Sequence, residues 1–364
     1  MSTLLLDTPA PAAKSRLWMP ARALFTPAAL DEAWGRQIHD RVQGLGIPME
    51  VMAANRLTNL RGEDVRSTYN SAKRTLAVVN APPSAARLSP IPPSADWQFH
   101  IAEGCPAHCQ YCYLAGSLAG PPIIRAFANV PGILDNLARY EKPGAGRNEA
   151  QGTTFEASCY TDPLSLEHLT GSLAECIRWF GTREDAYLRF VTKFSQVETL
   201  ISLPHNGHTR PRVSVNAAPV SRRLEGGTSA VSARLGGLRR LALPRAEGGG
   251  GYPIGLVIAP IMPIEDWREH YTALLDEAQA AVGFADDITF EMITHRFTPG
   301  SKDVLQSWYP NSSLEMSEEQ RTEKRNKFGG VKYVYPTDTM RDLRKFFESE
   351  IRARFPQGRI LYWT

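Results

Sequence analysis

Short apolar runs alternate with amphipathic stretches through the middle of the chain. Six of these runs predict β-strands, at residues 97–103, 153–158, 187–192, 210–215, 252–259 and 287–293. Helical periodicity marks three stretches between them, at residues 165–180, 220–241 and 264–282. Strands that alternate with helices predict an α/β fold with a parallel sheet or barrel, rather than a helical bundle or a sandwich of two sheets.

The two ends of the chain have different patterns. Helical patterning near residues 27–44 precedes a stretch, 81–96, in which five of sixteen residues are proline. Such a composition predicts an extended connector. Toward the other end, a mixed-charge run at 317–327 precedes FGGVKYVYP, which predicts a hairpin with Gly329 and Gly330 at its turn.

Three regions follow from these patterns. We predict an N-terminal region at residues 1–96, which includes the connector and packs on the barrel, and the barrel itself at residues 97–300. A C-terminal region at residues 301–364 would then hold the hairpin and an amphipathic helix over 338–353.

The composition excludes several classes of protein. The chain has 364 residues, of which 43% are hydrophobic and 22% charged, as in a soluble globular protein with a substantial core. A net charge of +3 is nearly neutral at this length, so a surface that binds nucleic acid would have to be local. The apolar run near the start is too short for a signal peptide, and no later run has membrane-spanning length. We therefore predict a cytoplasmic protein that does not bind membranes.

Three of the five cysteines lie within eight positions, in the segment EGCPAHCQYCYL. Cys105, Cys109 and Cys112 have the spacing C-x3-C-x2-C. Three thiolates can hold three irons of a 4Fe–4S cluster and leave the fourth iron open to a substrate or cofactor. A structural zinc site is the alternative, but zinc normally takes four protein ligands. His108 or Cys159 could complete such a set.

Reactive or polar residues follow nearly every predicted strand. In α/β barrels the carboxyl ends of the strands carry the chemistry. The residues at these positions are Cys159, Lys193, Asn216, Pro260 and the pair His295–Arg296. Cys159 has no apolar helical face around it and is predicted to be a functional thiol. Cys176 shares a helical face with leucine, isoleucine and phenylalanine residues and is predicted to lie in the core.

The remaining candidates have two interpretations each. Lys193 could meet a carboxylate or phosphate, or could be a solvated lysine at a strand end. Ser214 and Asn216 lie on one face of a strand, which suits paired hydrogen bonds either to a ligand or within the protein. Tyr111 and Tyr113 flank the last cysteine of the motif, and local patterning favours packing of that loop.

Several segments together resemble the spore photoproduct lyase family of the radical S-adenosylmethionine superfamily. The similarity covers roughly residues 17–364, in order. The segments are EGCPAHCQYCYL, TTFEASCYTDPLSLEHLTGSL, LRFVTKFSQV, HNGHTRPRVSVN, GLVIAPI, FEMITHRFT and KFGGVKYVYP. Members of this family repair DNA without using light. The resemblance implies a partial (β/α)6 barrel of TIM type.

The resemblance also implies two cofactors. Cys105, Cys109 and Cys112 match the residues that bind a 4Fe–4S cluster, whose open iron takes S-adenosylmethionine. Further positions match residues that contact S-adenosylmethionine, namely Thr161, Lys193, Ser214, Asn216 and Ala259.

The implied reaction reverses 5-thyminyl-5,6-dihydrothymine, the spore photoproduct, to two thymines by way of a 5′-deoxyadenosyl radical. Cys159 matches the hydrogen-atom donor, and Tyr111 and Tyr113 match tyrosines on the radical return path. Lys327 and Phe328 match hairpin residues that wedge into the duplex beside the lesion. The implied partners are UV-damaged double-stranded DNA and an electron donor such as a flavodoxin or ferredoxin.

The chain departs from the family pattern at two places. The wedge pair is Arg-Tyr in the family and Lys-Phe here, and Tyr-Thr-Asp replaces Thr-Ser-Asp after Cys159. Two alternative functions remain. One is a radical S-adenosylmethionine enzyme that acts on another pyrimidine photoproduct or on RNA, and the other is a non-catalytic, zinc-containing protein that binds damaged DNA.

Overall fold

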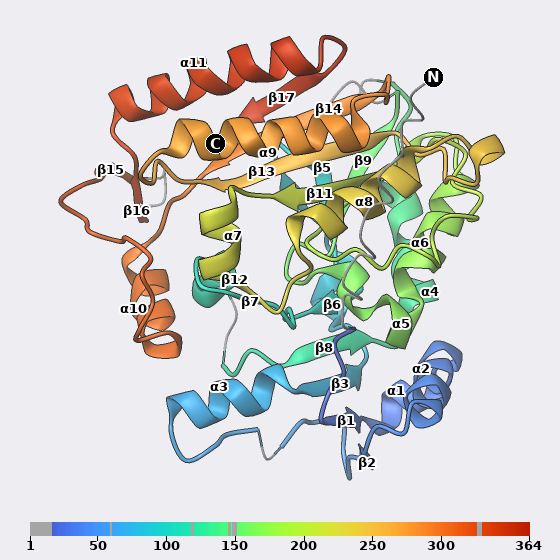
Figure 1. Ribbon diagram of the computed structural model, residues 1–364. Coiled ribbons are helices and arrows are strands. Elements are labelled where there is room, and N and C mark those ends of the chain that lie inside the picture. The colour runs from blue at the N-terminus through green and yellow to red at the C-terminus, as the bar shows by residue number, and fades with distance from the viewer. Residues whose placement is uncertain (1–16, 59, 118–119, 145–146, 148–150, 326–329) are drawn as a thin grey trace, which may run out of the picture.

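An eight-stranded sheet curls into a partial barrel in this computed structural model, which describes residues 17–364 apart from 59, 118–119, 145–146, 148–150 and 326–329 (Figure 1). Six parallel strands form its middle and match the predicted ones: β5 (Ala95–Phe99), β9 (Thr153–Ala157), β10 (Ala186–Thr192), β11 (Thr209–Val215), β13 (Ile254–Ile261) and β14 (Ile288–Thr294). Two edge strands were not predicted. They are β17 (Arg359–Trp363), parallel to β14, and β4 (Ser89–Ile91), antiparallel to β5.

Helices cover the outside of this sheet, and five of them lie where amphipathic stretches were predicted: α5 (Glu167–Thr170), α6 (Ser172–Gly181), α7 (Ala218–Leu224), α8 (Val231–Ala242) and α9 (Trp267–Val282). A further helix, α4 (Val130–Leu137), was not predicted. Short 3₁₀ helices add η3 (Ala138–Tyr140), η5 (Pro163–Leu166) and η6 (Arg245–Glu247). Apolar side chains of strands and helices meet in one large core. The connection between β10 and β11, all of which is described, contains turns and no helix.

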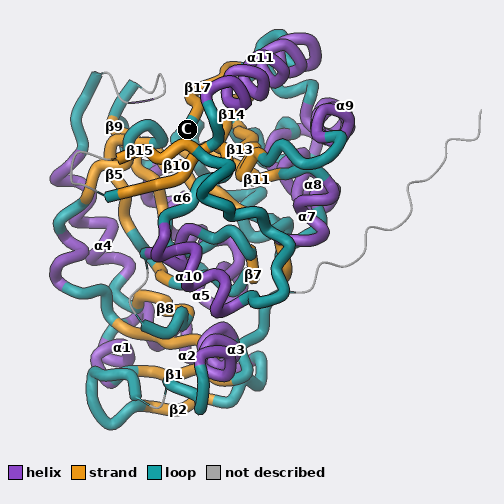
Figure 2. Tube along the Cα trace, turned by 90° about the vertical axis from the view of Figure 1, so that its left-hand side faces the viewer, coloured by secondary structure: helices purple, strands orange, loops and turns teal. Residues whose placement is uncertain are grey.

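A second, smaller sheet lies at the end of the molecule away from α11 (Thr337–Arg354), as both Figure 1 and Figure 2 show. Its strand order is β2 (Met49–Val51), β1 (Arg22–Phe25), β3 (Thr75–Val79), β8 (Ile124–Phe127) and β6 (Ala102–Glu103). The accompanying helices are α1 (Pro27–Asp31), α2 (Ala33–Gly44) and α3 (Val65–Lys73). The helical patterning predicted near 27–44 is confirmed, but the sequence analysis missed this sheet because its strands are only two to five residues long.

Two predicted elements near the connector are different in the structure. The predicted strand 97–103 is two strands in two sheets, because β5 belongs to the barrel whereas β6 pairs with β8 in the small sheet. The predicted extended connector, 81–96, contains η1 (Pro83–Ala86) and the edge strand β4. Since the small sheet draws strands from both sides of residue 96, the division of the chain into three regions stays a prediction.

The C-terminal part contains α10 (Pro299–Trp308), a hairpin and α11. The hairpin pairs β15 (Thr322–Arg325) with β16 (Val331–Val334). The sequence analysis had predicted the hairpin within FGGVKYVYP. Its first strand, β15, comes instead from the mixed-charge run at 317–327. The predicted helix 338–353 is confirmed as α11. Among the described residues, no helix combines the length and apolar character needed to span a membrane.

Candidate active site at the carboxyl ends of the barrel strands

The three clustered cysteines lie in a loop that leaves the small sheet after β6 and crosses the barrel opening. The loop begins at Gly104, whose φ is +76° and where a Cβ atom would lie 2.2 Å from the carbonyl oxygen of Ile123. Only glycine fits such a position. Cys109 lies in β7 (His108–Cys109), which pairs with the two-residue strand β12 (Glu225–Gly226). Cys112 directly precedes η2 (Tyr113–Gly116).

Burial raises the pKa of all three thiols, to about 12 for Cys105. The charges of Cys105 and Cys112 also raise the pKa of Cys109, so the three sulfurs lie within electrostatic range of one another. Lys73 and Lys193 act in the opposite direction: Lys73 lowers the pKa of Cys105 and Cys112, and Lys193 that of Cys109 and Cys112. A cluster requires thiolates, and these two lysines favour that form.

Lys73 was not identified from the sequence. It ends α3 in the N-terminal part and is buried, and its Nζ donates hydrogen bonds to the carbonyl oxygens of Cys105 and Ala107. This long-range contact positions the cysteine loop and brings a positive charge to it. No local sequence pattern distinguishes Lys73 from a lysine on a helix surface.

The described residues contain no group of three or more His, Cys, Asp or Glu side chains placed to hold a single metal ion. A zinc ion needs its ligands in one coordination sphere. In a 4Fe–4S cluster, by contrast, each cysteine binds a different iron. The three mutually interacting thiols, of which Cys109 is buried and the other two half-buried, therefore fit the cluster, with one iron left without a protein ligand.

Lys193 brings three of the predicted cofactor positions together beside the cysteine loop. Its Nζ lies 2.9 Å from Ser214 Oγ, 2.9 Å from a Glu225 carboxylate oxygen and 3.3 Å from the carbonyl oxygen of Ala259. Its backbone N–H donates to Asp162 Oδ2 over 2.7 Å, which fixes the residue at the end of β10. The ends of three neighbouring strands thus converge on one ammonium group.

Glu225, which the sequence analysis missed, connects this group to the cysteines. Its fully buried carboxylate accepts hydrogen bonds from Lys193, from Arg234 Nη2 at 2.6 Å and from the Tyr111 hydroxyl. Burial alone would raise the pKa of Glu225, but Lys193 and Arg234 lower it to about 2. Its backbone pairs with Cys109 across β12 and β7. Glu225 is therefore an anion held between the cofactor side and the cysteine loop.

The other two predicted cofactor positions are buried and hydrogen-bonded within the protein. Asn216 Nδ2 donates to the carbonyl oxygen of Pro260 at 2.7 Å, and its Oδ1 accepts from the Tyr271 hydroxyl and the Ala217 N–H, both at 2.9 Å. The Thr161 hydroxyl donates to the carbonyl oxygen of Gly104. The Asn216 contact ties the end of β11 to β13, and the Thr161 contact ties the turn after β9 to the cysteine loop.

Cys159 follows β9 across a strained turn, because Ser158 has a φ of +55°. Its thiol is half-buried, whereas Cys176 is fully buried on α6, as predicted. Burial and the neighbouring Glu156 carboxylate raise the pKa of the Cys159 thiol well above its ordinary range. At neutral pH the sulfur therefore carries its hydrogen.

The two tyrosines of the cysteine loop form hydrogen bonds with different partners. Tyr113 is 58% exposed, and its hydroxyl donates to the carbonyl oxygen of Cys159. Tyr111 donates to Glu225, and Lys193 Nζ lies 5.6 Å from the centre of its ring. Local patterning had favoured packing for both residues, but their hydroxyl groups also join the cysteine loop to Cys159 and to Glu225.

Not every predicted residue reaches this group. Lys327 and Phe328 lie outside the described residues, between β15 and β16. His295 is buried after β14, with its Nδ1 3.3 Å from Arg321 Nη2 in the C-terminal part. The strand-end pattern therefore also identified His295, whose contact with Arg321 lies in the C-terminal part and not in the Lys193 group.

Comparison with known proteins identifies the family to which this chain belongs. A family model described as spore photoproduct lyase matches residues 18–364. The chain belongs to the spore photoproduct lyase family. The curated spore photoproduct lyase of Bacillus subtilis (strain 168) is 37% identical over 350 residues, which are 95% of this chain and 99% of that protein. The spore photoproduct lyase of Geobacillus sp. (strain Y412MC61) is 35% identical over 350 residues, with the same coverage.

Solved structures of spore photoproduct lyase have the same fold. One, complexed with dinucleoside spore photoproduct, has a TM-score of 0.87 and 32% identity, and the match covers 96% of this chain and 100% of that one. A mutant spore photoproduct lyase with bound AdoMet and dinucleoside spore photoproduct gives the same values. The partial barrel is thus confirmed. Because the family consists of radical S-adenosylmethionine lyases, the alternative of a non-catalytic zinc protein is wrong.

Proposed function

We propose that this protein is a DNA repair lyase that reverses 5-thyminyl-5,6-dihydrothymine to two thymines. The observation that carries the proposal is the position of Cys159. A protonated thiol lies at the barrel mouth, and its backbone carbonyl is hydrogen-bonded to Tyr113 of the cysteine loop. One site thus combines a loop suited to a cluster with a separate thiol that can give up a hydrogen atom.

Cys105, Cys109 and Cys112 would hold the 4Fe–4S cluster. S-adenosylmethionine at its open iron would lie toward Lys193, Ser214 and Ala259, whose polar atoms converge there. When bound, these groups supply the radical that removes a hydrogen atom from the lesion. Asn216 and Thr161 would support this site mainly by fixing the strand ends, because their side chains form hydrogen bonds within the protein.

Cys159 would end the reaction by transferring its hydrogen atom to the thymine-centred radical that remains when the bridge between the two bases breaks. The sulfur then lacks a hydrogen atom, which it must recover before the next turnover. Tyr113 and Tyr111 would relay the radical away from it, since Tyr113 is hydrogen-bonded to Cys159 and Tyr111 to Glu225 beside Lys193. The raised pKa of Cys159 suits this role, because a thiolate has no hydrogen to give.

Double-stranded DNA is the proposed substrate. The hairpin of β15 and β16 belongs to the C-terminal part, and the resemblance assigns a wedge to Lys327 and Phe328. An apolar residue inserted between bases would offset part of the cost, a few kcal/mol, of flipping out the lesion. A flavodoxin or ferredoxin in the cytoplasm would supply the electron.

The test uses the anaerobically reconstituted protein, a reductant, S-adenosylmethionine and defined dinucleotide photoproducts. The wild-type protein should convert the spore photoproduct to thymines and leave cyclobutane dimers unchanged. The Cys159→Ala variant should still cleave S-adenosylmethionine, but thymine formation should fall by at least about tenfold, with misquenched products in its place. Cys176→Ala is the matched control and should repair normally.

Clean repair by Cys159→Ala would remove this thiol from the mechanism. Turnover of a different pyrimidine photoproduct, or of an RNA substrate, in preference to the spore photoproduct would instead support the alternative substrate predicted from the sequence.

A further inference from the structure

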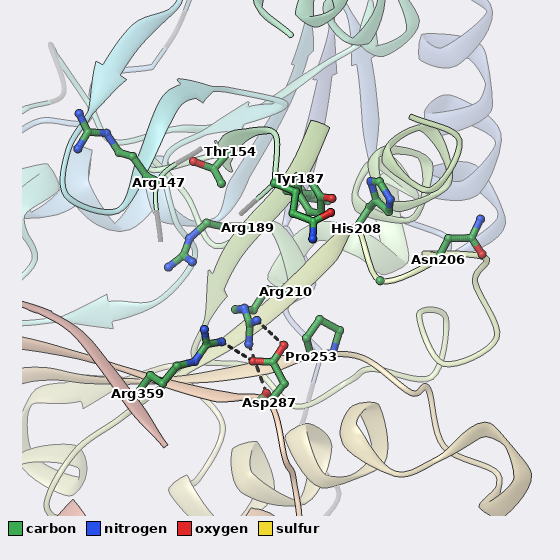
Figure 3. A pocket seen from close by; sticks show the side chains of 13 residues that line it. Arg147, Thr154, Tyr187, Arg189, Asn206, His208, Arg210, Pro253, Asp287 and Arg359 are labelled. Atoms are coloured by element: carbon green, nitrogen blue, oxygen red, sulfur yellow. Dashed lines mark hydrogen bonds and ion pairs between the residues drawn. The ribbon is translucent and has the colours of Figure 1, made fainter. Parts of the chain in front are cut away.

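A cavity of about 420 Å³ opens at the amino ends of the barrel strands, away from the cysteine loop. Thr154, Tyr187 and Arg210 come from the starts of β9, β10 and β11, and Arg359 from the start of β17 (Figure 3). The volume lies in the range of small-molecule sites, roughly 300–1,000 Å³. The chemistry at the other end of the strands does not use this cavity.

The charge of the cavity wall is strongly positive. Four arginines line it, whereas Asp287 is the one acidic side chain among the described lining residues. Arg210 Nη2 lies 2.7 Å from Asp287 Oδ2, and Arg359 Nη2 lies 2.6 Å from Asp287 Oδ1 (Figure 3). One carboxylate is therefore in contact with two guanidinium groups that line the same space.

Arg189 is the deepest of these arginines, with a side chain only 4% exposed. It donates one hydrogen bond to Glu291, but among the described residues its Nε–H has no hydrogen-bond acceptor, and the nearest Glu156 oxygen is 4.0 Å from Nε. Burial and the adjacent Arg212 lower the pKa of Arg189, although Glu291 and Glu156 oppose this effect. One buried N–H donor of Arg189 is thus left without an acceptor, although Glu291 and Glu156 balance part of its charge.

The wall beside the arginines is flat and aromatic. The rings of Tyr187 and His208 are stacked, with centroids 4.6 Å apart and planes 4° from parallel. His208 is held in this position because its Nδ1 lies 3.0 Å from the carbonyl oxygen of Ala186. The cavity is thus a rigid space that combines guanidinium groups with an aromatic surface.

We propose that this cavity binds a small phosphate-bearing molecule, with the phosphate held by Arg189, Arg210 and Arg359. Guanidinium groups suit phosphate because their N–H groups match the spacing of its oxygens. The ligand must be small, since a DNA duplex cannot reach a side chain as deeply buried as Arg189. The site is separate from the repair chemistry and does not depend on it.

Calorimetric titration of the reconstituted protein with inorganic phosphate and with pyrophosphate, at constant ionic strength, tests the proposal. Arg359→Gln should weaken binding by at least about tenfold, since it removes one charge-assisted contact of roughly 1.5–3 kcal/mol. Asp287→Asn should strengthen binding, because it removes a negative charge that would repel phosphate from the cavity. Arg344→Gln on α11 makes the same change in net charge away from the cavity and should leave the affinity unchanged.

The Arg344→Gln control separates a specific site from a general effect of net charge, because a general effect would weaken binding equally in Arg359→Gln and Arg344→Gln. Absence of measurable binding of either probe at about 10 mM, or equal weakening by Arg359→Gln and Arg344→Gln, would overturn the proposal. Thermal unfolding without phosphate and cleavage of S-adenosylmethionine should be near wild-type in both cavity variants, since neither residue lies at the active site.

Discussion

At the residue level, Cys159 is placed to give a hydrogen atom rather than to act as a nucleophile. A nucleophilic cysteine needs a lowered pKa. The structure produces the reverse, because burial and Glu156 raise the pKa of this thiol, while Arg212 lowers it less. The same sulfur could therefore serve in radical chemistry without reacting readily as a thiolate.

The raised pKa predicts how repair responds to pH. An unperturbed cysteine loses its proton near pH 8.5. Since the pKa of Cys159 lies above that value, the S–H form persists as the pH rises through it. We expect the share of turnovers that end in two thymines to stay constant from pH 7 to about pH 9, as measured by product analysis. A fall by half near pH 8.5 would contradict the raised pKa.

Single residues differed in how well the sequence identified them. Cys159 and Cys176 could be distinguished because an apolar helical face surrounds only the second. Lys73 and Glu225 could not be identified, because their importance comes from contacts with residues more than thirty positions away or on another element. Burial of a charged residue beside its partners is not a local property of the chain.

At the level of elements, the two-residue strand β12 connects the cysteine loop to Lys193. It pairs with β7, so it holds Cys109, and its Glu225 side chain holds Lys193 and Tyr111. If Lys193 contacts S-adenosylmethionine, β12 aligns the cofactor with the cysteine loop.

Replacement of Glu225 by glutamine tests this alignment. Loss of a charge-assisted hydrogen bond costs roughly 1.5–3 kcal/mol, so we expect the dissociation constant of S-adenosylmethionine to rise by about 10- to 100-fold. Iron content should be unchanged, because the cysteines and Lys73 remain. Equilibrium binding and iron analysis would measure both quantities. An unchanged affinity would restrict Glu225 to a structural role, and Glu225→Asp, which keeps the charge, serves as the control.

The elements that the sequence predicted well are the long ones. The six barrel strands are mostly apolar over five to eight residues, and the helices between them have a clear periodicity. The short strands of the small sheet lack such a pattern. Every residue of β15 is charged or polar, and β15 is recognised as a strand only through its pairing with β16. Their formation depends on partner strands, which a local pattern does not contain.

For the whole molecule, a buried network of charges joins the barrel strands across their interior. Glu291 on β14 accepts hydrogen bonds from Arg189 on β10 and from Arg212 on β11, the latter at 2.7 Å. Tyr362 on β17 donates to the same carboxylate, and Arg212 also pairs with Glu156 on β9. Five strands therefore depend on a few mutually compensating charges inside the sheet.

Replacement of Glu291 by glutamine should destabilise the protein by about 3–5 kcal/mol, because it leaves buried guanidinium groups without full compensation. The midpoint of urea unfolding measures the change. Asp342→Asn breaks the exposed ion pair with Arg268 and should cost less than about 1 kcal/mol. Equal losses in the two variants would show that the barrel does not depend on its interior charges.

The sequence by itself determined the alternation of strands and helices, the cysteine loop and the thiol after β9, because these depend on periodicity and on spacing along the chain. Only the tertiary structure decided which charges meet. It brought Lys73 from the small sheet's side to the cysteines, placed Glu225 between Lys193 and Arg234, and gathered arginines at the opposite end of the barrel. The physical reason is that electrostatic partners are selected by proximity in the folded state and by burial, and neither is encoded in any short segment.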